Sequence, residues 1–157
     1  MAGVRIEKPK RVRRTFTQTI AATPDVVFPL LCPVREVEWV AGWHPRLVIS
    51  ESGLVEAGCV FVMPDEPADS VWVVTRWDPA GHVVEFVKVT PGLAVGRIGI
   101  SLEEAEGNAE STAAHVSYEY TALSEAGELF VERFTEAHYE AFMKEWESEL
   151  NRFLERE

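Results

Sequence analysis

The chain has 157 residues, of which 46% are hydrophobic and 26% are charged, and its formal net charge is −11. This composition indicates one globular domain and excludes a disordered chain, which would combine low hydrophobicity with high charge. The acidity argues against non-specific binding to nucleic acid, and no apolar run approaches the ~20 residues that span a bilayer. Because the N-terminus also lacks an apolar signal-peptide core, we predict a cytoplasmic protein without integral membrane association.

The charge is unevenly distributed along the chain. Residues 1–14 contain six basic residues and one acidic residue, a net charge of +5, so the remaining 143 residues carry −16. We therefore predict a basic N-terminal arm, residues 1–13, followed by a single domain, residues 14–157. Two interpretations of the arm stay open. It is either a flexible or edge-strand segment that folds back on the acidic body, or a segment that binds a partner or a membrane surface.

The first predicted elements are one strand and two short helices. Arg14–Ile20 has large apolar side chains at even spacing, which predicts a strand. A helix is expected to begin at Pro24, because Thr23 is a good N-cap and proline suits the first helical position. This helix should be short or kinked, because Pro29 removes a helical hydrogen bond. A second short helix is predicted over Val34–Val40.

An antiparallel meander is predicted for the middle of the chain. Six short runs rich in β-branched and aromatic residues are separated by breaks that contain Gly or Pro, and no run is followed by a crossover helix. The predicted strands are Leu47–Ser50, Cys59–Met63, Val71–Trp77, His82–Thr90, Val95–Leu102 and Thr112–Ala122.

One long C-terminal helix is predicted over Glu128–Glu157, which has no internal Pro or Gly. At about 100° per residue, its first half presents a wide apolar wedge that includes Phe134, His138 and Phe142. A curved antiparallel sheet has one apolar face to cover, and this helix is the only large element able to cover it. The predicted fold class is therefore α+β: six or seven antiparallel strands wrapped around a long C-terminal helix, with two short helices after the first strand.

Two stretches of the sequence resemble a known family. The first is Ala22–Phe28 followed by Trp39, which is similar to the family's A-x-P-E-x-V-W/F helix start and later tryptophan. The second is Val74–His82, which resembles the family's V-x-x-W/Y-D-P-P hairpin. With the order of elements, these stretches resemble the helix-grip fold of the START-related, polyketide cyclase and pollen-allergen-like (SRPBCC) superfamily. The resemblance implies a cavity between the sheet and the C-terminal helix that binds an apolar small molecule.

Candidate ligand-binding residues come first from the C-terminal helix and the last strand. His138 is central in the apolar wedge, either as a buried neutral histidine satisfied by one hydrogen bond or as the polar group that orients a ligand. Tyr118 and Tyr120 share one face of the last strand, and buried tyrosine hydroxyls need partners. Phe134 and Phe142 complete this part of the predicted site.

Aromatic residues from other segments complete the candidate site. Trp39 and Trp43 flank the second short helix and are expected at the mouth of a pocket. Trp72 and Trp77 are at odd spacing on one strand, so they should face opposite sides of the sheet. Two valines that share the side of Trp77 favour this residue as the inward one. Phe61 lies in a strand with apolar residues on both faces, of which one must meet the core.

Motifs for metal or cofactor chemistry do not occur in the sequence. The four histidines lack metal-site spacing, the two cysteines form no CxxC pair, and neither a nucleotide-binding glycine motif nor G-x-S-x-G is present. We therefore predict no metal and no cofactor, and assign no catalytic residue. The expected partner is an apolar small molecule, and the sequence leaves a homodimer open.

Three hypotheses for the function stay open, because the fold does not determine it. The first is binding or transport of an apolar small molecule, such as a lipid, a polyketide or an aromatic compound. The second is a polyketide cyclase-like or aromatase-like enzyme, with His138, Tyr118, Tyr120 and Arg97 as the candidate proton-transfer groups. The third is a protein-interaction module comparable to co-chaperone members of the superfamily, suggested by the basic arm and the apolar strand faces.

Overall fold

A computed structural model describes residues 3–156 as one sheet, three α-helices and two 3-10 helices. Seven antiparallel strands form the sheet, in the order β1-β7-β6-β5-β4-β3-β2. The first half of the chain contains β1 (Arg11–Ile20), α1 (Pro24–Val27), η1 (Phe28–Leu31), η2 (Arg35–Glu38), β2 (Leu47–Ile49), β3 (Val60–Met63) and β4 (Ser70–Asp78). The second half contains β5 (Val83–Thr90), β6 (Ala94–Ala105), β7 (Asn108–Ala122), α2 (Glu125–Arg133) and α3 (Glu136–Glu155).

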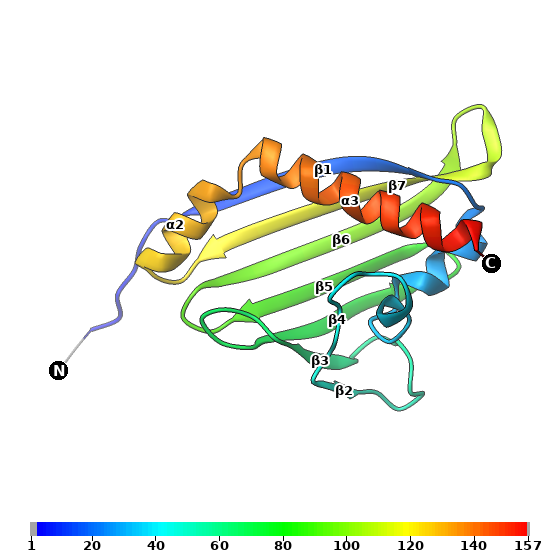
Figure 1. Cartoon of the computed structure of the whole chain (residues 1–157). Coiled ribbons are helices and arrows are strands. Elements are labelled where there is room, and N and C mark those ends of the chain that lie inside the picture. Colours follow the sequence, from blue (N-terminus) through cyan, green and yellow to red (C-terminus); the bar gives the residue numbers. More distant parts are fainter. Residues whose placement is uncertain (1–2, 157) are drawn as a thin grey trace.

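The elements form two layers (Figure 1). α3 lies across one face of the curved sheet, and the segment from α1 to η2 packs beside the C-terminal half of α3 on the same side. The predicted α+β class, with a curved antiparallel sheet and a covering C-terminal helix, is confirmed. None of the helices within residues 3–156 has the length and apolarity that crossing a membrane requires.

The core lies between the sheet and α3. Burial alternates along β6 and β7, so that every second side chain meets the helix layer. The largest fully buried side chains from both layers include Phe61, Ile20, Tyr139 and Met143. The hydroxyl of Tyr139 donates a hydrogen bond of 2.8 Å to the carbonyl oxygen of Val116, which ties α3 to β7, the strand next to the edge strand β1. Burial of apolar area and this bond together fix the position of the helix.

The first strand begins at Arg11, three residues before the predicted start. The guanidinium of Arg11 donates to Thr121 at 2.8 Å and lies 3.7 Å from Glu119, both on the neighbouring β7. Arg14 donates a hydrogen bond of 3.1 Å to the carbonyl oxygen of Phe134, at the end of α2. Part of the basic stretch is therefore an edge strand, while residues 3–10 carry no regular secondary structure. The predicted division into arm and domain stays a prediction.

Side chains of α3 also bind the backbone of β1 near its end. The amide of Thr19 donates to Glu147 at 2.7 Å, and the amide of Ala21 donates to Asn151 at 2.8 Å. The side-chain amide of Asn151 returns a bond of 3.1 Å to the carbonyl oxygen of Thr19. These bonds satisfy backbone groups that an edge strand otherwise leaves to water, and they anchor the second half of α3.

The prediction of one continuous C-terminal helix is wrong. α2 ends at Arg133, and Phe134 leaves the helical conformation with φ −82° and ψ 61°. α3 then begins with Thr135 as its N-cap, whose hydroxyl accepts a hydrogen bond of 3.1 Å from the amide of His138. A side-chain cap satisfies a free amide at a helix start, which is why the chain can begin a second helix here.

The break between α2 and α3 supplies a stability prediction. Thr135→Ala removes the capping hydroxyl and should lower the free energy of unfolding by about 1 kcal/mol. Thr135→Ser keeps the hydroxyl and should retain most of that free energy. Urea unfolding followed by circular dichroism compares the three proteins. Equal stability of the Ala and Ser variants would show that the cap does not hold the break.

Candidate functional site

A cavity of about 100 Å³ lies between the concave face of the sheet, the segment around η2 and the middle of α3. Its lining residues are Pro33, Glu36, Val40, Trp43, Phe61, Trp72, Phe86, Ile98, Ile100, Tyr118, Phe142 and Trp146. Seven of these twelve residues are aromatic, and only Glu36 and Tyr118 can ionise. The cavity is therefore a mostly apolar space with two ionisable groups, the usual composition of a small-molecule site.

The segment around η2 builds one wall through its residue spacing. Pro33, Glu36, Val40 and Trp43 follow one another at intervals of three, four and three residues, so they share one helical face. The indole N–H of Trp43 donates to the carbonyl oxygen of Pro33 at 2.8 Å. Because its only polar atom is satisfied within the wall, Trp43 presents an apolar ring to the cavity.

The strands build the opposite wall from stacked rings. Phe61 on β3 and Trp72 on β4 stack with centroids 5.2 Å apart at an interplanar angle of 23°. The ring centroid of Trp72 lies 5.8 Å from that of Trp43 and 5.9 Å from that of Phe86 on β5, in both cases with the rings nearly perpendicular. The indole N–H of Trp72 donates to the hydroxyl of Ser70 at 3.0 Å. Mutual packing holds these rings in place, so the wall is shaped before any ligand arrives.

Glu36 is the unusual residue of the cavity. Its side chain is buried, with 8% exposure for the residue, and within residues 3–156 its carboxyl group has no hydrogen-bond or ion-pair partner. Burial raises the pKa of Glu36 from 4.5 to about 8. Desolvation disfavours the charged form of an acid, so Glu36 is protonated in the free protein at neutral pH.

Tyr118 is the second polar group of the cavity. Burial, followed by the nearby Tyr120, Tyr139 and Glu36, raises the pKa of Tyr118 well above its ordinary value. Its hydroxyl therefore stays protonated and has no partner within the part of the chain that the structure describes. The ring is held by Phe142 of α3, whose centroid lies 5.6 Å away. The cavity thus offers one hydroxyl and one carboxyl group to a ligand.

Four of the predicted site residues line the cavity: Trp43, Phe61, Tyr118 and Phe142. They come from the η2 segment, β3, β7 and α3, so the fold brings together residues that are distant in sequence. Phe142 is 37% exposed and lies at the border between the cavity and the surface. That these four residues contact a ligand stays a prediction.

Three other predicted residues are buried beside the cavity without lining it. The indole of Trp39 donates to the carbonyl oxygen of Leu30 at 3.0 Å, and its ring meets Trp146 at 5.1 Å. Tyr120 and Phe134 pack against each other in a neighbouring aromatic cluster, with their ring centroids 5.0 Å apart. These residues support the walls of the cavity and do not form its surface.

The prediction that Trp72 and Trp77 face opposite sides of the sheet is wrong, whereas the predicted inward orientation of Trp77 is confirmed. The register between β4 and β5 shifts between Val74 and Arg76, and an extra residue in one strand reverses the alternation beyond it. Trp72 is buried and lines the cavity. Trp77 pairs with the buried Val84 on the same face, but it stacks on Phe28 at 4.4 Å, away from the cavity.

The predicted place of His138 in an apolar wedge is also wrong. His138 is exposed in the first turn of α3, where its backbone amide is capped by Thr135. The break before α3 changes the phase of the helix, so that Tyr139 and Met143 are buried in its place. His138 therefore does not orient a ligand in the cavity.

Sequence analysis missed Glu36, Trp72, Phe86 and Trp146 as cavity residues. Strict alternation along β4 would turn Trp72 away from the core if Trp77 faces inward, and the register shift between Val74 and Arg76 removes this restriction. A signal for Glu36 did exist, because it shares a helical face with Pro33 and Val40, and an acidic residue on an apolar face requires a reason.

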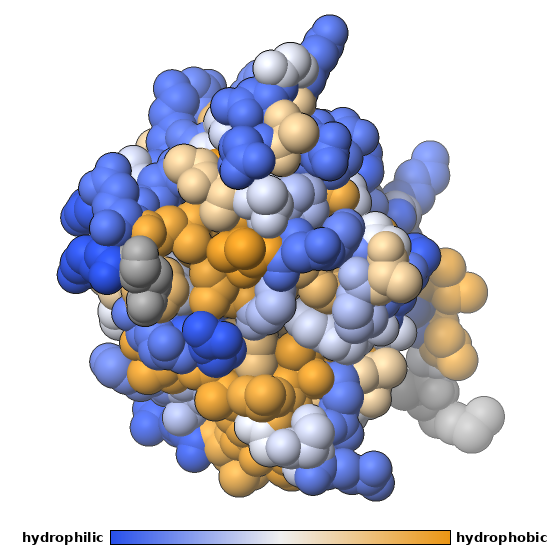
Figure 2. Space-filling model, turned by 90° about the vertical axis from the view of Figure 1, so that its right-hand side faces the viewer, coloured by the Kyte–Doolittle hydropathy of each residue, from blue (hydrophilic) through white to orange (hydrophobic). Residues whose placement is uncertain are grey.

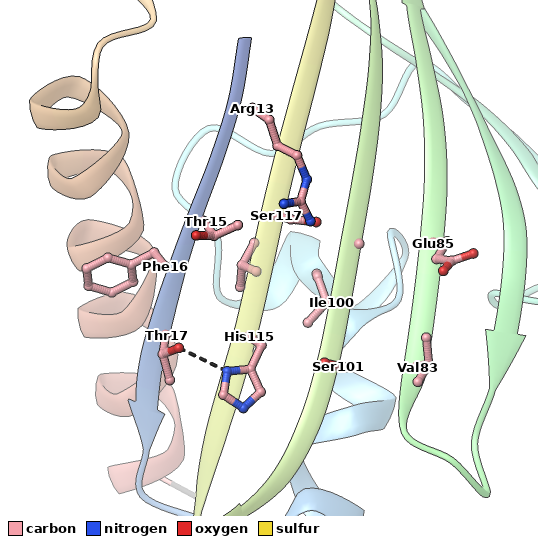
Figure 3. Close-up of a pocket in the computed structure, with 12 residues that line it drawn as sticks. Arg13, Thr15, Phe16, Thr17, Val83, Glu85, Ile100, Ser101, His115 and Ser117 are labelled. Atoms are coloured by element: carbon pink, nitrogen blue, oxygen red, sulfur yellow. Dashed lines mark hydrogen bonds between the residues drawn. The ribbon is translucent and has the colours of Figure 1, made fainter.

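A second hollow lies on the opposite face of the sheet (Figure 3). Its volume is about 400 Å³, and it is lined by side chains that include Arg13, Thr15 and Ser117. Thr17 Oγ1 and His115 Nδ1 are 2.9 Å apart there, and His115 Nε2 lies 2.9 Å from Glu103. This series of a hydroxyl, an imidazole and a carboxyl group is exposed to solvent. The backbone amides of these paired strands are used within the sheet, so they cannot stabilise the oxyanion that a catalytic triad of this kind would form.

Arg97 lies on this same opposite face, exposed, and takes no part in the cavity that contains Tyr118. Its predicted role beside Tyr118 in proton transfer is therefore wrong. Within residues 3–156, no group of three His, Cys, Asp or Glu side chains is placed to hold a metal ion.

The surface at the end of the molecule where α3 ends is apolar in part. Figure 2 views this end and shows hydrophobic residues gathered in a band between hydrophilic margins. Large apolar side chains that remain exposed in the η2 and β2 region are Val37, Leu47, Ile49 and Leu54. Exposed apolar patches on soluble proteins often serve binding.

Comparison with known proteins concerns the fold. The sequence matches no protein-family model, and no curated protein matches it. The structure is similar to norcoclaurine synthase from Thalictrum flavum, with a TM-score of 0.68 at 15% identity, covering 94% of this chain and 97% of that chain. This chain has the helix-grip fold. The fold predicted from the resemblance to the SRPBCC superfamily is confirmed.

Two further solved structures agree. One is the same Thalictrum flavum synthase in complex with dopamine and hydroxybenzaldehyde, with a TM-score of 0.64 at 14% identity, covering 96% of this chain and 95% of that chain. The other is Ara h 8.0201, with a TM-score of 0.60 at 14% identity, covering 89% of this chain and 97% of that chain. At these identities the likeness concerns the fold, and function must be argued from the site.

Glu36 should make stability depend on pH. Because its pKa is raised from 4.5 to about 8, the folded chain holds one more proton than the unfolded chain between these values. The contribution of Glu36 to the free energy of unfolding should therefore fall by about 1.4 kcal/mol per pH unit as the pH rises through this window. Above pH 8 this contribution should stay constant. Urea unfolding at several pH values measures this effect. From pH 5 to 8 the free energy of unfolding of Glu36→Gln should rise relative to that of the wild type, while that of the exposed control Glu38→Gln should not. A constant difference between the wild type and Glu36→Gln would contradict the assignment.

Proposed function

We propose that the protein binds a small aromatic or apolar molecule in the cavity beneath α3. The observation that carries the proposal is an aromatic-lined space whose two ionisable side chains, Glu36 and Tyr118, have no hydrogen-bond partner within residues 3–156. The apolar rings supply affinity through burial of ligand surface, and the two polar groups supply orientation.

The size of the cavity narrows the class of ligand. Its volume of about 100 Å³ lies well below the ~300 to 1,000 Å³ that encloses a drug-sized molecule. A single-ring compound matches this space better than a sterol or a whole lipid. The complex of the fold neighbour norcoclaurine synthase with dopamine and hydroxybenzaldehyde, both single-ring compounds, supports the same choice.

A ligand-binding test uses phenol and hydroxybenzaldehyde as probes. Both should bind the wild type, with chemical-shift changes in NMR spectra confined to cavity residues. Ile98→Phe fills the cavity from the sheet side and should weaken binding at least tenfold. Ile98→Leu conserves volume and should bind as the wild type does. Failure of the wild type to bind either probe, or unchanged binding by Ile98→Phe, would overturn the proposal.

A second candidate function is proton transfer on the bound molecule. The observation that favours it is a carboxyl group whose pKa is raised to about 8, beside a protonated tyrosine hydroxyl in the same cavity. A general acid or base works best when its pKa lies near the working pH. Glu36 would move the proton, and Tyr118 would donate a hydrogen bond to the oxygen on which charge develops. Glu36, and not the exposed His138, is therefore the candidate acid and base.

Deuterium exchange at the α-carbon of phenylacetone, followed by NMR in D₂O, tests this activity. The wild type should accelerate exchange over buffer, with a rate that rises to a plateau near pH 8 as Glu36 ionises. Glu36→Gln should lose about 100-fold of the acceleration, and Tyr118→Phe should lose less. The Glu38→Gln variant serves as the matched control. Absence of acceleration by the wild type would reject this candidate and leave ligand binding untouched.

A further inference from the structure

We propose that the ligand of this cavity is a small organic cation, an ammonium group carried on a compact apolar body. The inference rests on the proposed function and adds the charge of the ligand to it. Two features of the cavity carry it together: a lining of aromatic rings, and one buried carboxyl group that has no partner within residues 3–156.

The aromatic wall is suited to a cation. The faces of aromatic rings carry partial negative charge, and tryptophan attracts a cation most strongly. Trp43, Trp72 and Trp146 line the cavity from three different segments of the chain. The protein already uses this interaction nearby, where the ammonium group of Lys88 lies 5.2 Å from the centre of the Trp72 ring. Because Phe61 and Lys88 already lie against the Trp72 ring, a ligand cation would make this kind of contact with Trp43 or Trp146.

The carboxyl group of Glu36 supplies the opposite charge. It is buried with 8% exposure and has only apolar and aromatic neighbours in the cavity, apart from Tyr118. An ionised carboxylate is costly in such surroundings unless an opposite charge lies beside it. A bound ammonium group provides that charge, so ligand binding and ionisation of Glu36 favour each other. The same carboxylate repels an anionic ligand such as a fatty acid.

Among residues 3–156, Glu36 is the one side chain of the cavity lining that can carry charge near neutral pH. Arg35 and Glu38 on η2 pair with each other at 2.6 Å and do not line the cavity. Lys88 on β5 is paired with Asp65 at 3.5 Å and donates a hydrogen bond to Tyr120 at 3.3 Å.

The residues that β3, β6 and α3 contribute to the cavity carry no charge, and Tyr118 of β7 keeps its proton. Within residues 3–156, Glu36 is thus the group at the cavity that titrates near neutral pH.

The space suits a compact head group. A cavity of about 150 Å³ is known to hold benzene. The cavity here, at about 100 Å³, is smaller than that, so it would enclose only the ammonium head of a ligand while the rest of the molecule extends out of it. Phe142 at the border, 37% exposed, marks where the rest of the ligand would leave the cavity.

Three probes that share a branched head with three methyl groups and differ in charge test the inference. Choline is the cation, 3,3-dimethyl-1-butanol is its neutral isostere, and 3,3-dimethylbutanoate is the anion. Isothermal titration calorimetry at pH 9 should give choline at least tenfold tighter binding than the neutral isostere, and no binding of the anion. As the pH falls below 8, choline affinity should decrease by about tenfold per unit until the preference is lost, while the neutral isostere stays unchanged.

A matched pair of variants locates the effect. Glu36→Gln removes the carboxylate at nearly the same volume, so choline should lose its preference and its pH dependence while the neutral isostere still binds. Glu38→Gln makes the same charge change outside the cavity and should behave as the wild type does. Retention of the choline preference in Glu36→Gln would overturn the inference.

The outcomes separate this inference from the proposed function. If phenol and the neutral isostere bind but choline binds no better at pH 9, the cation assignment is wrong and the ligand-binding proposal stands. If the neutral isostere binds more tightly than choline at pH 9 as well as at pH 6, the carboxylate of Glu36 does not attract the cation, and the cation assignment is again wrong. If no probe binds, phenol included, both proposals fail.

Discussion

One helix cannot cover the concave face of a seven-stranded sheet, and the rest of the structure follows from this mismatch. α3 lies over β1 and is bound to it by Glu147 and Asn151, which leaves the face of β3 to β6 to be covered by other groups. The segment around η2 and a layer of aromatic rings perform that task. Rigid rings do not fill an irregular space completely, so a cavity remains where the three groups meet.

The position of Glu36 follows from the same need to cover the sheet. The short 3-10 helix that closes the sheet must turn one side toward the cavity, and Glu36 lies on that side with Pro33 and Val40. An alanine or leucine there would avoid the cost of burying a carboxyl group. Retaining an unpaired acid at the expense of stability is typical of functional sites, where local rules are broken for the sake of chemistry.

Much of the fold could be predicted from sequence, because turn residues and alternation mark the strands and the order of elements has few solutions. The site was harder to predict. Trp72 and Trp77 depend on a shift of register at Val74 that no local pattern announces, and one extra residue exchanges the faces of everything beyond it. His138 depends on a helix break whose cap, Thr135, is an ordinary residue in the middle of a helical composition.

The arrangement of tryptophans has an optical consequence. Of the five indoles, Trp43, Trp72 and Trp146 line the cavity, and Trp39 touches Trp146. Only Trp77 lies apart, stacked on Phe28. Most of the intrinsic ultraviolet emission therefore comes from chromophores at or next to one internal space. The chain carries a built-in reporter, whose colour and intensity follow the polarity and occupancy of that space without any added label.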